Sequence, residues 1–135
     1  MKKFLSTKYS AGAFNVGMLL LRVALGILLL SHGYDKLIKF ESLQQKFMNF
    51  MGLGSTVSLA LVVFAEVFCS IFVILGLFTR LAVIPIIIAM FVAVAMAHNF
   101  QIFSNGEKPF IFLICGIAIL FCGPGKISID GAMKK

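Results

Sequence analysis

Two charged residues inside long apolar runs constrain the fold of this chain more than any other feature. Arg22 lies within the apolar run at residues 14–31, and Glu66 lies within the apolar run at residues 57–78. A lone charge in a segment of membrane-spanning length is costly, so both side chains are expected to face the interior of a helix bundle. With a rise of ~1.5 Å per residue in two antiparallel helices whose ends are level, the two charges differ by only ~5 Å in depth. We therefore expect a buried Arg22–Glu66 ion pair that keeps the carboxylate ionised.

The composition places the chain among integral membrane proteins. Its apolar residues make up 61% of the sequence, whereas soluble domains contain ~45–50%. Four apolar runs, at residues 14–31, 57–78, 81–97 and 110–122, approach the ~20 residues of a spanning helix when their flanks are included. The sequence thus predicts an all-α membrane protein with one domain over residues 1–135. Its fold is expected to be a four-transmembrane-helix antiparallel bundle with helices close to residues 14–37, 56–78, 80–103 and 108–123.

The connection between the first two predicted helices has a helical pattern of its own. Phe40, Leu43, Phe47 and Met51 recur at helical spacing, with polar residues between them. This pattern predicts a short amphipathic helix at residues 40–51 that lies at the outer membrane interface. Such a helix either shields the ends of the spanning helices or covers the mouth of a cavity, and the pattern does not decide between the two.

The basic residues orient the helices rather than indicate nucleic-acid binding. The formal charge is +7, but the basic residues flank apolar runs and form no patch interleaved with aromatic residues. With four spans, one side of the membrane receives seven basic residues and the other receives four, Lys36, Lys39, Lys46 and Lys108. The excess predicts that both termini are cytoplasmic. The first run is expected to be a retained helix, because Arg22 interrupts it and no cleavage site follows.

Several polar residues are expected near the outer ends of the helices. They predict an outward-facing polar pocket with the Arg22–Glu66 pair at its floor, and the candidate ligand-binding residues are Arg22, His32, Lys36, Glu66 and His98. The two imidazoles can exchange protons near neutral pH. Alternatively, the ion pair only fixes helix register and the histidines only form hydrogen bonds at helix ends. No catalytic residue can be assigned, and two histidines without a third clustered ligand do not predict a metal site.

The three cysteines, Cys69, Cys115 and Cys122, all lie in apolar runs and lack metal-finger spacing. Buried free cysteines usually pack as small hydrophobic residues. A redox pair of Cys69 and Cys122, which fall at similar depth, is a minor alternative, so the role of the cysteines stays open.

Five short motifs in a fixed order resemble the DoxX family. They are LRVALG at residues 21–26, HGYDKL at 32–37, LGLFTR at 75–80, AMAH at 95–98 and GPGKISID at 123–130, with Glu66 between the second and third. The resemblance covers roughly residues 17 to 130. It implies a small four-helix protein of the bacterial inner membrane in which Arg22, His32, Lys36, Glu66 and His98 occupy the family-like polar positions. Asp130 matches the last motif, and its position beyond the fourth helix suggests that it anchors the tail; the cysteines are not part of the resemblance.

The resemblance implies chemistry less strongly than it implies fold. The family takes its name from a membrane subunit associated with quinol oxidation and thiosulfate:quinone oxidoreduction, other members are linked to redox and thiol-stress complexes, and many have no established activity. The first hypothesis is therefore a redox-associated membrane subunit that binds a quinone-like apolar ligand. Because the sequence has no flavin, haem or iron–sulfur motif, electrons would come from a redox partner protein.

Two other functions stay open at the level of the sequence. The chain is alternatively a non-catalytic scaffold or assembly subunit of a larger complex, in which the buried charges serve packing alone. A small-solute carrier ranks last, because four helices would need a homo-oligomer and the sequence has no repeat or pair of broken helices. Whether the chain is an enzyme by itself is not decided by its sequence.

Overall fold

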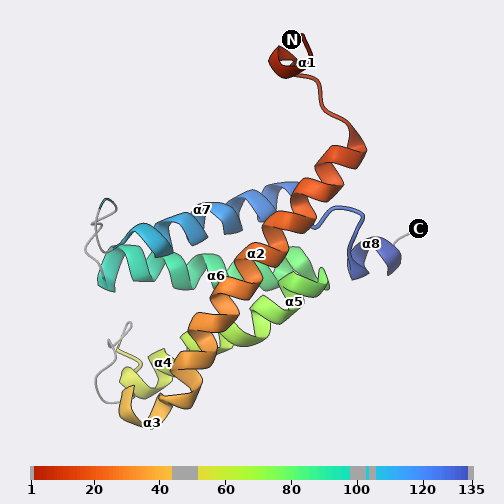
Figure 1. Ribbon diagram of the computed structural model, residues 1–135. Coiled ribbons are helices and arrows are strands. Elements are labelled where there is room, and N and C mark those ends of the chain that lie inside the picture. The colour runs from red at the N-terminus through yellow and green to blue at the C-terminus, as the bar shows by residue number, and fades with distance from the viewer. Residues whose placement is uncertain (1, 44–51, 98–102, 104–105, 134–135) are drawn as a thin grey trace.

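The computed structural model describes residues 2–43, 52–97, 103 and 106–133, and these residues form helices and turns without a strand. Figure 1 shows their arrangement. The elements are, in chain order, α1 (Lys2–Leu5), α2 (Ala11–Ile38), α3 (Phe40–Leu43), α4 (Ser55–Val63), η1 (Phe64–Cys69), α5 (Ser70–Leu75), α6 (Thr79–Val92), η2 (Ala93–Ala97), α7 (Glu107–Cys122) and α8 (Ile129–Met133).

The longest helix, α2, runs obliquely across the other helices (Figure 1). It begins three residues before the predicted position, because Ser10 is its N-cap and accepts a hydrogen bond from the Ala13 amide. It is long and apolar enough to cross a membrane, and so is the continuous segment Ser55–Leu75, while Thr79–Ala95 is a shorter apolar helix. One side of α2 is buried against η1, α5 and α7, which leaves its other side outside the packed core.

The second long segment is not a uniform α-helix. Its middle third, η1, has π-helical hydrogen bonding and contains Glu66. The segment ends at Leu75, three residues before the predicted end, where Gly76 adopts a left-handed conformation with φ 71°. A residue without a Cβ is favoured there. Nothing in the apolar pattern of residues 57–78 indicated the π-helical segment.

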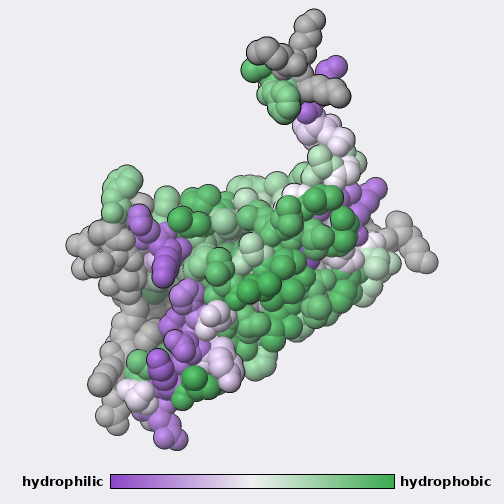
Figure 2. Space-filling view, viewed as in Figure 1, coloured by the Kyte–Doolittle hydropathy of each residue, from purple (hydrophilic) through white to green (hydrophobic). Residues whose placement is uncertain are grey.

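The core lies where α2, the η1–α5 segment, α6 and α7 meet. Its fully buried side chains include Leu29, Val73, Val83, Ile86 and Ile119. The strongest contacts join α6 to α7 and α2 to α5. Figure 2 shows apolar residues over the middle of the visible face and hydrophilic residues toward its ends, as expected for a protein surrounded by lipid.

Two predicted segments lie partly outside the described residues. The interfacial helix predicted at residues 40–51 is represented by α3, and residues 44–51 are not described. The third helix, predicted over residues 80–103, is represented by α6 and η2, and residues 98–102 are not described.

Glycine at position 33 allows α2 to approach the π-helical segment closely. A Cβ at Gly33 would lie 2.8 Å from the Glu66 backbone carbon and 2.8 Å from the Glu66 Cβ. Gly33→Ala is therefore expected to destabilise the protein by ~1–3 kcal/mol through overpacking. Thermal unfolding in detergent measures this effect. The matched control is Gly17→Ala on the same helix, where a Cβ would meet nothing within 4 Å, so its unfolding temperature should stay the same or rise slightly. Equal unfolding temperatures for the two variants would contradict the close helix contact.

Candidate functional site

A pocket of about 250 Å³ opens between the helices, near the end of α6 and the start of α7. Residues from α2, η1, α6, η2 and α7 line it, so each of the four long helical segments contributes. Among the described residues, the lining consists of three charged side chains, one imidazole and apolar residues: Leu29, His32, Lys36, Glu66, Met90, Ala93, Lys108, Pro109 and Phe112.

An ion pair between neighbouring helices is the main polar feature of this pocket. Lys36 Nζ donates a hydrogen bond of 2.8 Å to Glu66 Oε1. The Glu66 side chain is only 4% exposed, whereas that of Lys36 is 29% exposed. The carboxylate is therefore held inside the protein by a cation that still reaches the pocket, which is the arrangement that a buried charge requires.

Both π-helical segments contribute to the pocket. Glu66 belongs to η1 and Ala93 belongs to η2. A π-helical turn contains an extra residue, so it changes which side chains face a neighbouring helix. Such turns occur frequently at functional sites. Their coincidence at one pocket indicates a site with a specific geometry rather than a packing defect.

His32 from α2 and Lys108 from α7 complete the polar lining of the pocket. The His32 ring contacts the Phe112 ring with the centroids 6.0 Å apart and the planes tilted by 60°. Lys108 lies at the start of α7, one turn before Phe112. Of the five predicted site residues, the structure thus brings together His32, Lys36 and Glu66 in one pocket. His98 lies outside the described residues.

The predicted Arg22–Glu66 pair is wrong. Arg22 is fully buried, and its guanidinium donates to backbone carbonyls rather than to a carboxylate. Arg22 Nη1 lies 3.1 Å from the Val73 carbonyl oxygen and 3.1 Å from that of Ile74. Arg22 Nη2 donates to the Ile127 carbonyl. The arginine therefore satisfies carbonyls at the end of α5 and connects that helix end to the segment after α7.

The error came from the assumption that the ends of α2 and of the second segment are level. The first turns of α2 extend past the end of α5 and contact the tail instead, since the Lys126 amide donates to the Asn15 side chain. Glu66 is consequently level with Gly33, and Arg22 is level with the end of α5. About 11 residues of α2 separate the two levels, or ~16 Å along its axis, which no arginine side chain spans.

Asp130 anchors the tail to the turn between α5 and α6. Its two carboxylate oxygens accept hydrogen bonds from the Phe78 amide at 2.8 Å and the Thr79 amide at 2.9 Å. Its own amide donates to the Gly76 carbonyl at 2.8 Å. The N-cap of α6 is Phe78, whose side chain does not cap the helix. The remote carboxylate of Asp130 fulfils this role.

Ionisation of the Asp130 carboxyl is expected to make part of the folded protein's stability depend on pH in the acid range. Burial raises its pKa, but the amides of Thr79 and Phe78 and the charge of Arg22 lower it, and the resulting pKa lies below the ordinary value of 3.8. A lowered pKa in the folded state contributes stability that is complete above 3.8 and is lost as the pH falls through the folded value. Asp130→Ala should cost ~0.5–2 kcal/mol at pH 7, like other N-cap losses.

Unfolding temperatures at pH 7 and at pH 3 measure this effect. The difference in unfolding temperature between the unmodified protein and Asp130→Ala should be smaller at pH 3 than at pH 7. Asp35→Ala is the control, since Asp35 is exposed and lies 3.8 Å from Lys39, a distance at which a surface pair contributes little. A gap that is the same at both pH values would contradict the capping role.

Two pocket residues were not among the predicted site residues. Lys108 was used only to orient the helices, and Phe112 was not singled out. The available signal was their spacing, because residues 108 and 112 are four apart and so lie on one face of the helix. Among the described residues, no three His, Cys, Asp or Glu side chains gather as metal ligands do. Cys69, Cys115 and Cys122 are free thiols, and none lines this pocket.

Comparison with known proteins identifies the family. The family model described as DoxX matches residues 17–99, which is more than half of the chain and includes Arg22, His32, Lys36 and Glu66. Searches of curated proteins and of solved structures found no match. The apolar helices agree with the membrane location of the family. The chain is a membrane protein and belongs to the DoxX family.

Proposed function

We propose that this protein is a redox-associated subunit of the bacterial inner membrane that binds a quinone-like apolar ligand in the Lys36–Glu66 pocket. The observation that carries the proposal is the pocket itself, in which a buried ion pair lies among apolar side chains and beside two further donors. Apolar walls with a few placed polar groups are typical of small-molecule sites.

The lining matches the chemistry of a quinone head group. Leu29, Met90 and Phe112 offer an apolar surface to the ring, and the ammonium groups of Lys36 and Lys108 offer hydrogen bonds to its carbonyl oxygens. The His32 imidazole offers a further hydrogen-bonding group. The volume of about 250 Å³ is slightly below the ~300–1,000 Å³ of most ligand sites. The pocket therefore suits a ring, with the isoprenoid tail remaining in lipid.

The proposal includes an arrangement in the membrane. The segments α2, α4–η1–α5, α6–η2 and α7 each cross the bilayer in an antiparallel bundle, and both termini are cytoplasmic. The excess of basic residues on the side that holds Arg80 and Lys126 supports this orientation. The pocket then opens toward the exterior, and a redox partner protein supplies or accepts electrons.

Binding of a short-chain quinone analogue to the purified protein in detergent, measured by isothermal titration calorimetry, tests the proposal. Ala93→Leu places a larger side chain in the pocket lining without changing any charge, and it should weaken binding at least about tenfold, as expected when a ligand loses its space. The matched control is Ala24→Leu, at an exposed position of α2, which should bind as the unmodified protein does. Equal affinities for both variants would contradict the pocket assignment.

A non-catalytic scaffold is the second candidate. The small volume of the pocket favours it, and so do the contacts of Arg22 and Asp130, which connect three chain segments without serving a ligand. In that case the unmodified protein would bind no quinone analogue. Variants of the ion pair would then affect function only as far as they affect folding.

A further inference from the structure

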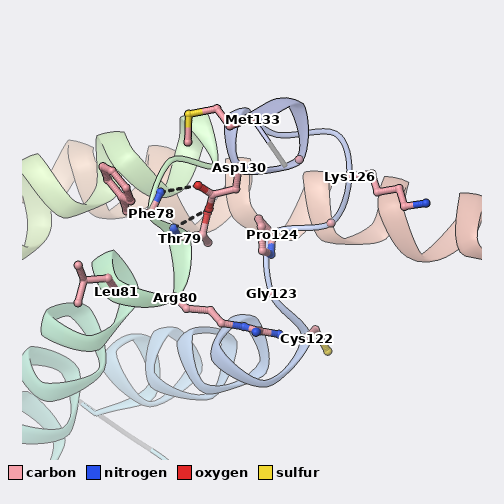
Figure 3. Close-up of a pocket in the computed structure, with 12 residues that line it drawn as sticks. Phe78, Thr79, Arg80, Leu81, Cys122, Gly123, Pro124, Lys126, Asp130 and Met133 are labelled. Atoms are coloured by element: carbon pink, nitrogen blue, oxygen red, sulfur yellow. Dashed lines mark hydrogen bonds between the residues drawn. The ribbon is translucent and has the colours of Figure 1, made fainter. Parts of the chain in front are cut away.

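A second cavity opens at the opposite ends of α6 and α7. Its volume is about 1010 Å³, and it lies between the α5–α6 turn, the end of α7 and the tail with α8 (Figure 3). Its ionised side chains are Arg80, Lys126 and Asp130, and its apolar walls include Phe78, Leu81 and Met133. None of these residues belongs to the quinone pocket, so the inference below does not depend on quinone binding. It shares with the proposed function only the orientation in the membrane.

Arg80 is a cation in the lining of this cavity. Among the described residues no carboxylate lies within ion-pair distance of it. Its guanidinium donates one long hydrogen bond of 3.3 Å to the Phe121 carbonyl. Figure 3 shows the side chain extending from α6 toward the loop that follows α7. A Cβ at Gly123 would lie 3.0 Å from Arg80 Nη2, so a glycine leaves room for the guanidinium there.

Asp130 is the carboxylate in the described lining of the cavity, and it leaves Arg80 available to an added anion. Figure 3 shows Asp130 turned toward the Phe78 and Thr79 amides, away from Arg80. Lys126 is exposed and extends away from both residues in Figure 3, so its long side chain adds positive charge at the edge of the cavity. In the part of the chain that the structure describes, the lining therefore has two cations against one carboxylate that is already bonded.

An apolar groove continues from this cavity along the helices. Its volume is about 280 Å³, and its lining is apolar: Phe64, Cys69, Phe72, Phe78, Leu81, Ala82, Ile84 and Pro85. Phe78 and Leu81 line both spaces, so the groove and the cavity adjoin. The groove follows α6 as far as Pro85, which lies ~9 Å along the helix from its first residue, Thr79. An unpaired arginine at the end of a spanning helix thus lies beside an apolar channel that runs inward.

We infer that the cavity and the groove together bind one anionic phospholipid, with its phosphate on Arg80 and an acyl chain in the groove. Arginine binds phosphate through charge-assisted hydrogen bonds. The excess positive charge favours a lipid with a net negative charge over a zwitterionic one, whose ammonium would find only Asp130. Anionic lipids are concentrated at cytoplasmic membrane surfaces, where juxtamembrane basic residues attract them.

Backbone amides do not form the phosphate site. Pro124 lacks an amide hydrogen, so the turn at Gly123 and Gly125 offers no row of donors. The Phe78 amide before α6 and the Thr79 amide that opens it already donate to Asp130. We therefore assign the binding energy to the Arg80 side chain and to the apolar groove.

Native mass spectrometry of the purified, delipidated full-length protein in detergent tests the inference. Phosphatidylglycerol and phosphatidylcholine with the same acyl chains are added separately, and the bound fraction is measured against lipid concentration. Phosphatidylglycerol should bind about tenfold more tightly than phosphatidylcholine, and Arg80→Gln should weaken its binding about tenfold, as expected for loss of a charged hydrogen bond. Arg80→Lys should retain most of the affinity, since lysine also binds phosphate.

The matched control is Lys8→Gln, which removes one exposed charge before α2 without touching the cavity. It should leave phosphatidylglycerol binding unchanged. Equal weakening by Arg80→Gln and Lys8→Gln, or equal binding of the two lipids, would overturn the inference. Inorganic phosphate and glycerophosphoglycerol at millimolar concentration should fail to displace the lipid, and displacement by either would show a small-anion site instead. Gel filtration and circular dichroism verify that each variant is folded.

Discussion

Arg22→Met is expected to destabilise the folded protein by about 3–5 kcal/mol. Methionine keeps an unbranched side chain like the apolar stem of arginine, but it removes every hydrogen-bond donor from a fully buried position. The Ile74 and Ile127 carbonyls then lose the partner that Arg22 provides, and an unsatisfied buried carbonyl costs ~1–3 kcal/mol. The link that Arg22 forms between the end of α5 and the tail is lost at the same time. The midpoint of thermal unfolding in detergent measures the effect.

Arg22→Lys separates charge from geometry. A single ammonium cannot reach carbonyls on two chain segments as the guanidinium fork does, so this variant should also be clearly destabilised, though less than Arg22→Met. The control is Lys39→Met, an exposed position of the same chain, which should change the midpoint little. A lysine variant as stable as the unmodified protein would contradict the role of Arg22 as a multiple carbonyl donor.

Lys36→Met is expected to have the second large effect, about 3–5 kcal/mol, because it leaves Glu66 buried without a cation. The Glu66 side chain is 4% exposed and has Lys36 Nζ at 2.8 Å. Glu66→Gln should cost less, since the Lys36 side chain is 29% exposed and can move its ammonium toward water. Unfolding midpoints of both single variants show this asymmetry. Equal costs would contradict the unequal burial of the two partners.

The double variant Lys36→Met with Glu66→Met separates the two proposed functions. Replacement of a buried ion pair by apolar residues of similar volume is often neutral or stabilising, so folding should recover. Recovered folding with loss of quinone-analogue binding supports a ligand pocket. Recovery of both folding and cellular function supports the scaffold instead.

The sequence predicted which charges are buried but not how they pair. An isolated arginine and an isolated glutamate in apolar runs suggested that the two residues pair with each other. The relative shift of two helices, however, cannot be read from their lengths alone. Gly26 and Gly33 determine that shift, because each lets α2 approach a particular turn of the second segment. The seven-residue spacing of these glycines was visible in the sequence, whereas their contacts were not.

The tail and the π-helical segments show the same limit. Asp130 was expected to anchor the tail, and it does so through two amides that are 51 and 52 residues away in the chain. Its exact partners depend on tertiary contacts that propensity does not encode. The π-helical turns at Glu66 and Ala93 leave no composition signal, because apolar residues fill α- and π-helical turns equally well. They nevertheless decide which side chains reach the pocket.

The central claim is that a quinone-like ligand occupies the pocket around the Lys36–Glu66 pair. Photolabelling of the protein in native lipid with a quinone analogue that has a photoreactive ring tests it most directly, with labelled peptides mapped by mass spectrometry. The label should appear on residues that line this pocket, such as His32, Lys36, Met90 or Phe112, and an excess of unlabelled quinone should suppress it. Labelling spread over lipid-facing residues, unchanged by that excess, would contradict the account.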